Sequence, residues 1–134
     1  MFELPSEEPQ VLVVDDVPAT RLALKDMLQE MGFTRIEEAS GGREALEKLK
    51  KQGAQLIVCD YMMGEMSGLD LLNQLRNHAY LVDIPFIVIS SNGDAPVIET
   101  AIDLGAADYV VKPISFNLLK LKIMDVLRRR SEPR

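Results

Sequence analysis

Three aspartates and one lysine stand at the ends of apolar runs of the chain, where their charges could bind phosphate or a metal ion. The runs, with the charged residues that end them, are Val11–Val14 with Asp15 and Asp16, Leu56–Cys59 with Asp60, and Tyr109–Val111 with Lys112. Continuous apolar runs of this length predict strands of a parallel sheet that is covered on both faces. Ligands of such sheets bind outside the carboxyl ends of the strands, where the strand order reverses. We therefore expect the four charged side chains to converge.

Three carboxylates that share one site need a counter-ion. Two unit charges about 4 Å apart repel by about 4 kcal/mol at an effective dielectric of about 20. A hard divalent cation answers that need, and Mg²⁺ usually binds through one or two carboxylates together with water and phosphate oxygens. Taken one at a time, Asp15, Asp16 and Asp60 are equally consistent with helix N-caps or solvated loop acids. Only the set of three favours a metal site.

The composition limits the classes of protein to which the chain can belong. It has 134 residues, a length typical of one domain, with 47% hydrophobic and 27% charged residues. The net charge of −6 and the pI near 4.8 argue against direct binding to nucleic acid, which needs a basic surface. Cys59 is the single cysteine and cannot form an internal disulfide, which favours a reducing cytoplasm. No apolar stretch approaches the roughly 18 residues of a membrane span, so we expect no membrane insertion.

Strand-like and helix-like segments alternate along the chain. Strands are expected at residues 11–14, 35–39, 56–59, 86–90 and 109–111, with the polar segment 35–39 at a sheet edge. Helices are expected from Pro18 to Gly32, from about Gly42 to Gln52, after Gly68, from about Pro96 to Leu104, and near the C-terminus. Five strands alternating with five helices predict an α/β fold with a doubly wound parallel sheet. A flavodoxin-like strand order of 2-1-3-4-5 would make the first and third strands neighbours.

Each expected helix carries an apolar stripe that should face the sheet. The inward residues are expected to be Leu24, Met27, Leu28 and Met31; Ala45, Leu46 and Leu49; Leu71, Leu72 and Leu75; Val97, Ile98, Ala101 and Ile102; and Leu119, Ile123, Val126 and Leu127. Around this core, residues 1–9 are predicted to be a flexible leader and residues 10–128 one folded domain. Residues 129–134 are predicted to be a basic tail, as a solvated helix end or as the stub of a linker.

Four short motifs of the chain resemble those of a known family. They are Val-Asp15-Asp16, the segment Asp60-Tyr-Met-Met-Gly-Glu-Met-Ser-Gly68, Val-Ile-Ser90 and Lys112-Pro113. Asp60 lies 44 residues after Asp16, and Ser90 and Lys112 lie 30 and 52 residues after Asp60. The motifs and intervals, over residues 11–127, resemble the response regulator receiver domain of two-component signalling, which includes the stand-alone chemotaxis regulators. The resemblance implies the flavodoxin-like order 2-1-3-4-5.

The resemblance also implies a phosphoacceptor and a Mg²⁺ site. Asp60 would be the nucleophile that forms an aspartyl phosphate. Asp16 and Asp60 would hold Mg²⁺, Asp15 would act directly or through water, and the backbone carbonyl of Met62 would complete the protein ligands. Phosphoryl transfer depends on positioning and charge neutralisation more than on proton chemistry, which agrees with these residue types.

Further residues would contact the phosphoryl group or respond to it. The resemblance implies that Lys112 pairs with one phosphoryl oxygen, that Ser90 hydrogen-bonds another, and that a cis bond before Pro113 turns the lysine toward the acids. Ser91 stands next to Ser90, and only spacing and strand alternation select Ser90. Tyr109 is either a half-buried aromatic of an edge strand or, as the resemblance implies, a switch that turns inward when Ser90 moves to the phosphate.

Some positions depart from the family pattern or stand apart from it. The family commonly has proline where Gly64 stands, so we expect a more flexible loop after Asp60. Met62 and Asn92 should set how readily water attacks the acyl phosphate. A thioether cannot orient water, so we predict slow-to-moderate self-dephosphorylation, which a half-life of a few seconds in Mg²⁺ would contradict. His78 is expected to be a surface residue.

Two other classes with phosphate chemistry fit the sequence poorly. Phosphatases of the haloacid dehalogenase type need a second aspartate two residues after the nucleophile, where this chain has Met62. A flavodoxin-like cofactor binder needs a loop rich in serine, threonine or glycine after the first strand. Here Asp15 and Asp16 would repel the cofactor phosphate instead.

The resemblance therefore implies a cytoplasmic signalling switch that is not an enzyme in its own right. It would receive its phosphoryl group from a histidine kinase or a phosphotransfer protein. Residues 96–104, residues 109–111 and the last helix would form the face that binds a downstream protein target or an output domain. A degenerate receiver that acts as an unphosphorylated adaptor, and the N-terminal receiver of a longer regulator, remain alternatives. Whether phosphorylation drives dimerisation also stays open.

Overall fold

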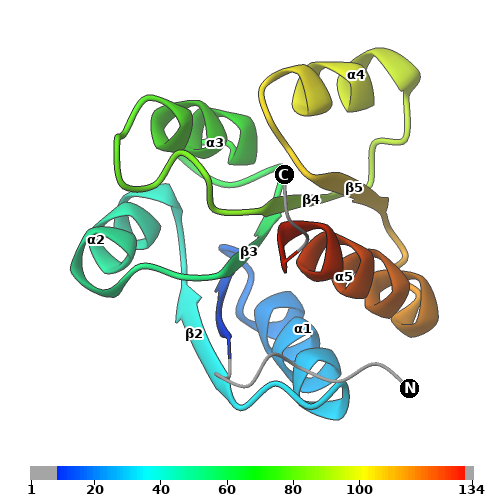
Figure 1. The fold of residues 1–134 in the computed structure, drawn as a ribbon. Helices are drawn as coiled ribbons and strands as arrows, with labels where there is room; N and C mark the ends of the chain where they lie inside the picture. Colours follow the sequence, from blue (N-terminus) through cyan, green and yellow to red (C-terminus); the bar gives the residue numbers. More distant parts are fainter. Residues whose placement is uncertain (1–8, 132–134) are drawn as a thin grey trace.

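The computed structural model describes residues 9–131, so most of the expected leader and residues 132–134 of the expected tail lie outside the described residues. The strands are β1 (Gln10–Val14), β2 (Arg35–Ala39), β3 (Leu56–Asp60), β4 (Phe86–Ser90) and β5 (Asp108–Val111). The helices are α1 (Pro18–Glu30), α2 (Gly42–Gln52), α3 (Gly68–Arg76), α4 (Ala95–Asp103) and α5 (Phe116–Ser131). Strand and helix alternate along the described chain, as the sequence predicts (Figure 1).

The sheet has the predicted doubly wound topology. All neighbouring strands pair in parallel, in the order β2-β1-β3-β4-β5. The order reverses at β1, because β2 lies on one side of it and β3 on the other. Helices α1 and α5 cover one face of the sheet, and α2, α3 and α4 cover the other (Figure 1). The flavodoxin-like fold is therefore confirmed.

The central strands are apolar and buried, so charged side chains are found only at their ends. Every residue of β1, β3 and β4 is buried, because the helices cover both faces. Successive side chains of β1 face opposite layers: Leu12 packs toward α2 and α3, whereas Val13 packs toward α1 and α5. The polar strand β2 takes the sheet edge, as expected. Charged groups that follow β1 and β3 are thus held at the rim of a rigid core.

Two residues expected to be buried are exposed. Ile102 has 44% of its surface exposed, because α4 packs through Val97, Ile98, Ala101 and Leu104, which leaves Ile102 at the border of that stripe. The buried Ala101 brings the helix close to the sheet. Val111, which the apolar run placed inside a covered strand, is 40% exposed because it is the last residue of the edge strand β5.

The C-terminal helix α5 runs from Phe116 through Ser131, beyond residue 128. Its inward residues Leu119, Ile123, Val126 and Leu127 are buried against the sheet, as expected. None of the described helices is both long enough and apolar enough to cross a membrane.

Candidate functional site

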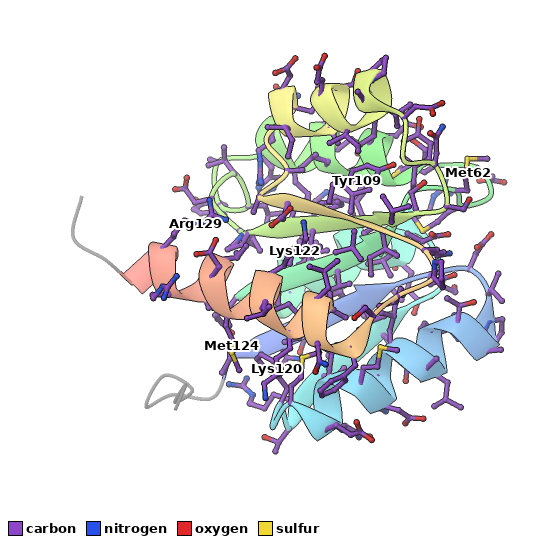
Figure 2. The ribbon with its side chains drawn as sticks, turned by 90° about the vertical axis from the view of Figure 1, so that its right-hand side faces the viewer. Met62, Tyr109, Lys120, Lys122, Met124 and Arg129 are labelled. Carbon is purple, nitrogen blue, oxygen red and sulfur yellow. The ribbon has the colours of Figure 1, made fainter. Side chains whose placement is uncertain are left out.

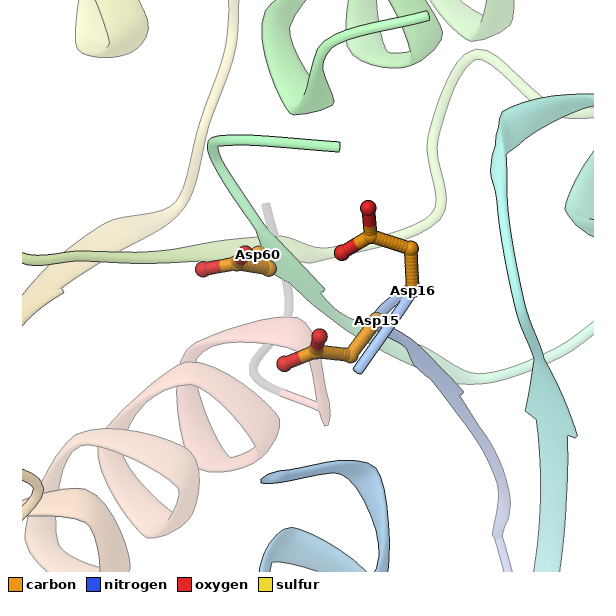
Figure 3. A group of neighbouring side chains, drawn as sticks. All are labelled: Asp15, Asp16 and Asp60. Carbon is orange, nitrogen blue, oxygen red and sulfur yellow. The ribbon is translucent and has the colours of Figure 1, made fainter. Parts of the chain in front are cut away.

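The ends of β1 and β3 bring three carboxylates together. Asp15 and Asp16 directly follow β1, and Asp60 is the last residue of β3. These strands pair in parallel with Val14 opposite Cys59, so Asp15 stands beside Asp60. One carboxylate oxygen from each of the three aspartates lies within 4.8 Å of the others (Figure 3). The acids at the strand ends therefore converge on one site. We call Asp15, Asp16, Asp60 and the neighbouring Lys112 the acidic pocket.

Burial leaves two oxygens of the acidic pocket without a hydrogen bond. Asp15 is 1% exposed and Asp60 is 5% exposed, whereas Asp16 is open to solvent. Oδ1 of Asp15 accepts a hydrogen bond from the Val17 amide at 2.9 Å, but its Oδ2 is buried with no donor. Oδ1 of Asp60 also accepts no hydrogen bond, and its close partner is the Lys112 ammonium in an ion pair. A buried Asp15 oxygen without a donor, beside an Asp60 oxygen whose close partner is one ammonium group, suits a hard cation that takes oxygen ligands.

Burial and the neighbouring negative charges both affect the pKa of Asp15. Burial raises this pKa above its ordinary value, and the neighbouring charges of Asp60 and Asp16 raise it further. The Val17 amide and the Lys112 charge act in the opposite direction without cancelling the rise. Three acids and one lysine therefore leave a site that favours an added positive charge.

Lys112 directly follows β5, which is separated from β3 and Asp60 by the strand β4. Its backbone amide donates to the Ser90 carbonyl at 2.7 Å, which carries the β4–β5 ladder one residue further. Its Nζ lies 3.0 Å from Oδ1 of Asp60. The peptide bond to Pro113 is cis, as the resemblance implies.

The loop after Asp60 returns close to its own start. The Gly68 amide donates to the Tyr61 carbonyl at 2.8 Å, and a Cβ at residue 68 would lie 2.5 Å from the Asp60 carbonyl oxygen. Only glycine fits so close to the backbone of the third acid. Ser67 caps α3 in a reciprocal pair of hydrogen bonds with Asp70. Within this loop the Met62 side chain is 68% exposed, away from the core (Figure 2).

Ser90 and Tyr109 meet at a node that the sequence does not reveal. Ser90 is buried and Ser91 is exposed, so burial distinguishes the two serines. The Asn92 amide donates to Oγ of Ser90 at 3.0 Å, and the Tyr109 hydroxyl donates to the Asn92 carbonyl at 2.7 Å. Tyr109 is buried rather than half-buried, with its hydroxyl under the β4–α4 loop. Because this node uses backbone groups of Asn92, no side-chain pattern could have indicated it.

His78 takes no part in the site. It lies on the loop between α3 and β4, which leads into the N-terminal end of β4, whereas the aspartates lie at the C-terminal ends of β1 and β3. Its Nδ1 accepts a hydrogen bond from the Tyr80 amide at 3.3 Å.

A doubly wound sheet with an acidic pocket at its switch point defines a class of α/β domains that bind charged ligands there. Comparison with known proteins narrows this class to one family. The model of the response regulator receiver domain matches residues 11–124, and the chain belongs to that family.

Known relatives agree with this assignment. The chain is 36% identical over 119 residues to chemotaxis protein CheY1 of Helicobacter pylori, covering 88% of this chain and 96% of that protein. It is 30% identical over 118 residues to the probable chemotaxis protein CheY of Rhizobium etli, covering 88% and 92%. The chemotaxis response regulator CheY4 of Vibrio cholerae has the same fold, with a TM-score of 0.83 at 27% identity over 90% of this chain and 99% of that one. The receiver domain of a signal transduction histidine kinase from Syntrophus aciditrophicus has a TM-score of 0.84 at 28% identity, covering 94% of this chain and 95% of that one.

Family membership establishes the general character of the chain. Receiver domains are signalling switches rather than conventional enzymes, and they interact with histidine kinases or phosphotransfer proteins and with downstream targets. They bind Mg²⁺ in an acidic pocket, and the cluster of Asp15, Asp16 and Asp60 fits such an ion in residue type and spacing.

Proposed function

We propose that this chain accepts a phosphoryl group on Asp60 in a Mg²⁺-dependent reaction and that phosphorylation changes its binding to a protein partner. The donor would be the phosphohistidine of a histidine kinase or phosphotransfer protein. The observation that carries the proposal is the acidic pocket itself, with three carboxylates inside 4.8 Å and the Lys112 ammonium 3.0 Å from Asp60.

Each residue of the acidic pocket has a distinct part in the transfer. A carboxylate oxygen of Asp60 attacks the phosphorus, the bond from phosphorus to the imidazole nitrogen breaks, and the imidazole leaves with the electron pair of that bond. Asp16, Asp60, the Met62 carbonyl and Asp15, directly or through water, would hold Mg²⁺, which neutralises charge on the phosphoryl oxygens when bound. The Lys112 ammonium, already beside Asp60, pairs with a further phosphoryl oxygen.

Ser90 is the residue that senses the new group. Its Oγ accepts a hydrogen bond from the Asn92 amide, which leaves its own proton available for a phosphoryl oxygen. Shifting a population from 1:99 to 99:1 needs about 5.5 kcal/mol of differential stabilisation. Hydrogen bonds to charged oxygens contribute about 1.5–3 kcal/mol each, so new contacts from Ser90 and Lys112 supply much of that.

The response would reach a partner through α4, β5 and α5. Ala101 is the one buried residue of α4, whereas each of the other described helices has at least two, so among the helices we expect α4 to shift at the least cost. Tyr109 links its N-terminal loop to β5 through the Asn92 carbonyl. Figure 2 shows α5 beside β5 on the same side of the molecule. A downstream protein or an output domain would read this surface.

Intact-protein mass spectrometry after treatment with acetyl phosphate and MgCl₂ tests the proposal. We expect the wild type to gain the mass of one phosphoryl group and Asp60→Asn to gain none, because the amide is not a nucleophile for this transfer. Asp26→Asn, which changes an exposed aspartate of α1, is the matched control and should be modified like the wild type. An unmodified wild type would instead favour the unphosphorylated adaptor.

A further inference from the structure

A basic residue stands where the first turn of α1 disfavours it. Arg21 is the fourth residue of that helix, and cations near a helix N-terminus oppose the helix dipole. Its guanidinium is engaged on two sides. Its Nη1 donates to the backbone carbonyl of Asp15 at 2.7 Å, and its Nε donates to Oε1 of Glu38 on β2 at 3.1 Å. Arg21 therefore ties the turn after β1 to the neighbouring strand.

The carbonyl that Arg21 holds belongs to the peptide group between Asp15 and Asp16. The Asp15 amide on the other side donates to the Ala39 carbonyl at 3.1 Å, so both backbone groups of Asp15 are tethered. Rotation of that peptide would turn the Asp16 carboxylate relative to β1. Holding its oxygen fixes the direction in which the exposed acid of the pocket points. Arg21 does this through the backbone and Glu38, without a hydrogen bond to a carboxylate of the acidic pocket.

We propose that Arg21 is a positioning residue of the Mg²⁺ site, oriented by Glu38 and acting through the Asp15 carbonyl. This inference rests on the proposed function, because it assumes that the acidic pocket binds Mg²⁺. Groups that orient metal ligands typically change metal affinity by about 10–100-fold when removed. Because Arg21 acts through a peptide group rather than on a ligand atom, the lower end of that range applies.

Calorimetric titration of the full chain with MgCl₂ measures the effect directly. Arg21→Met keeps the aliphatic stem and should raise the Kd for Mg²⁺ about tenfold. Glu38→Gln should raise it less, since the guanidinium keeps its contact with the carbonyl but loses its charged anchor. Arg21→Lys should fall between wild type and Arg21→Met, because one ammonium cannot reproduce the planar fork. Lys25→Met is the matched control: it removes the other cation of Glu38, 3.3 Å away, and should leave the Kd unchanged.

Phosphorylation by acetyl phosphate separates positioning from a general loss of structure. The Mg²⁺ concentration for half-maximal rate should rise about tenfold in Arg21→Met, in step with Kd, while the rate at saturating Mg²⁺ returns to that of the wild type. A merely structural role would lower thermal stability without moving that midpoint. In Arg21→Met/Glu38→Gln the Kd should equal that of Arg21→Met alone, because both changes break one linkage.

The outcomes separate this inference from the proposed function. A wild type that binds no Mg²⁺ overturns the proposed function and this inference with it. A wild type that binds Mg²⁺ while Arg21→Met binds it equally well overturns the role of Arg21 alone. Should Arg21→Met not fold, a folded Glu38→Gln with wild-type Kd overturns the role instead.

Discussion

Two groups of charged residues lie side by side in this molecule and are built in opposite ways. The acidic pocket holds three carboxylates and one lysine, with two buried oxygens that accept no hydrogen bond. The other group, which we call the β2 network, contains three glutamates and three cations in two sets of ion pairs. Glu38 pairs with Arg21 and Lys25, and Lys48 pairs with Glu37 and Glu44. One group carries unbalanced charge and the other is balanced.

The pKa shifts have opposite signs in the two groups. Burial raises the pKa of Asp15 in the acidic pocket. Burial would also raise the pKa of Glu38, but hydrogen bonds from Arg21 and Lys25 outweigh it and lower that pKa. For Glu44 the hydrogen bond from the Ser40 hydroxyl is the main cause of a lowered pKa. In the β2 network the protein itself supplies the partners of the carboxylates. In the acidic pocket the excess negative charge favours a bound cation.

The largest effect expected from this contrast is stabilisation by Mg²⁺. At a Mg²⁺ concentration about 100 times Kd, binding should add about 2.7 kcal/mol to the free energy of unfolding. For a chain of this size that corresponds to a rise of roughly 10 °C in the midpoint of thermal unfolding. Scanning calorimetry in EDTA and in MgCl₂ measures it, and Asp16→Asn should lose most of the rise. A rise of equal size in Asp16→Asn would place the ion elsewhere.

A smaller effect is expected from Asp15→Asn, which should raise the free energy of unfolding, whereas most mutations lower it. Without Mg²⁺ the amide removes one of three repelling charges, so the variant should be more stable than the wild type by about 1–2 kcal/mol at neutral pH. Because the folded pKa of Asp15 is raised, the wild type regains this stability as pH falls through that pKa and the carboxyl is protonated. Urea unfolding in EDTA should therefore show the gap closing toward acid. A gap that widens toward acid would mean that Asp15 is not destabilising when charged.

The smallest effect is expected in the β2 network, from Glu44→Gln. Lys48 lies 3.4 Å from Glu44, and exposed pairs of this kind contribute about 0.3–0.5 kcal/mol. Since the folded pKa of Glu44 is lowered, this stability is present above its ordinary pKa and is lost as pH falls through the folded value. Urea unfolding at neutral and acid pH checks this, and Mg²⁺ binding should be unaffected. A change in Mg²⁺ affinity would show that Glu44 also acts on the acidic pocket, as we propose for Arg21 and Glu38 but not for this residue.

Much of the fold followed from local patterns. The apolar runs at β1, β3 and β4 predicted strands buried on both faces, and alternation with helices predicted the doubly wound sheet; both are confirmed. The expected burial of Ile102 and Val111 was wrong, for reasons that the periodicity of the sequence does not contain. Ile102 lies at the border of the stripe through which α4 packs, and the position of β5 at the sheet edge exposes its last residue, Val111.

The sequence by itself determined which residue types stand at the strand ends and that parallel strands would bring them to one rim. It did so because the length of an apolar run and the alternation of strands with helices can be read from residues that are neighbours along the chain. Only the tertiary structure decided which oxygens remain without donors, that the Tyr109 hydroxyl meets the Asn92 carbonyl, and that Arg21 reaches both Asp15 and Glu38. The contacts of Tyr109 with Asn92 and of Arg21 with Glu38 each join positions 17 residues apart through backbone atoms or flexible side chains. Their geometry is set by how the layers pack, which leaves no periodic signal in the sequence.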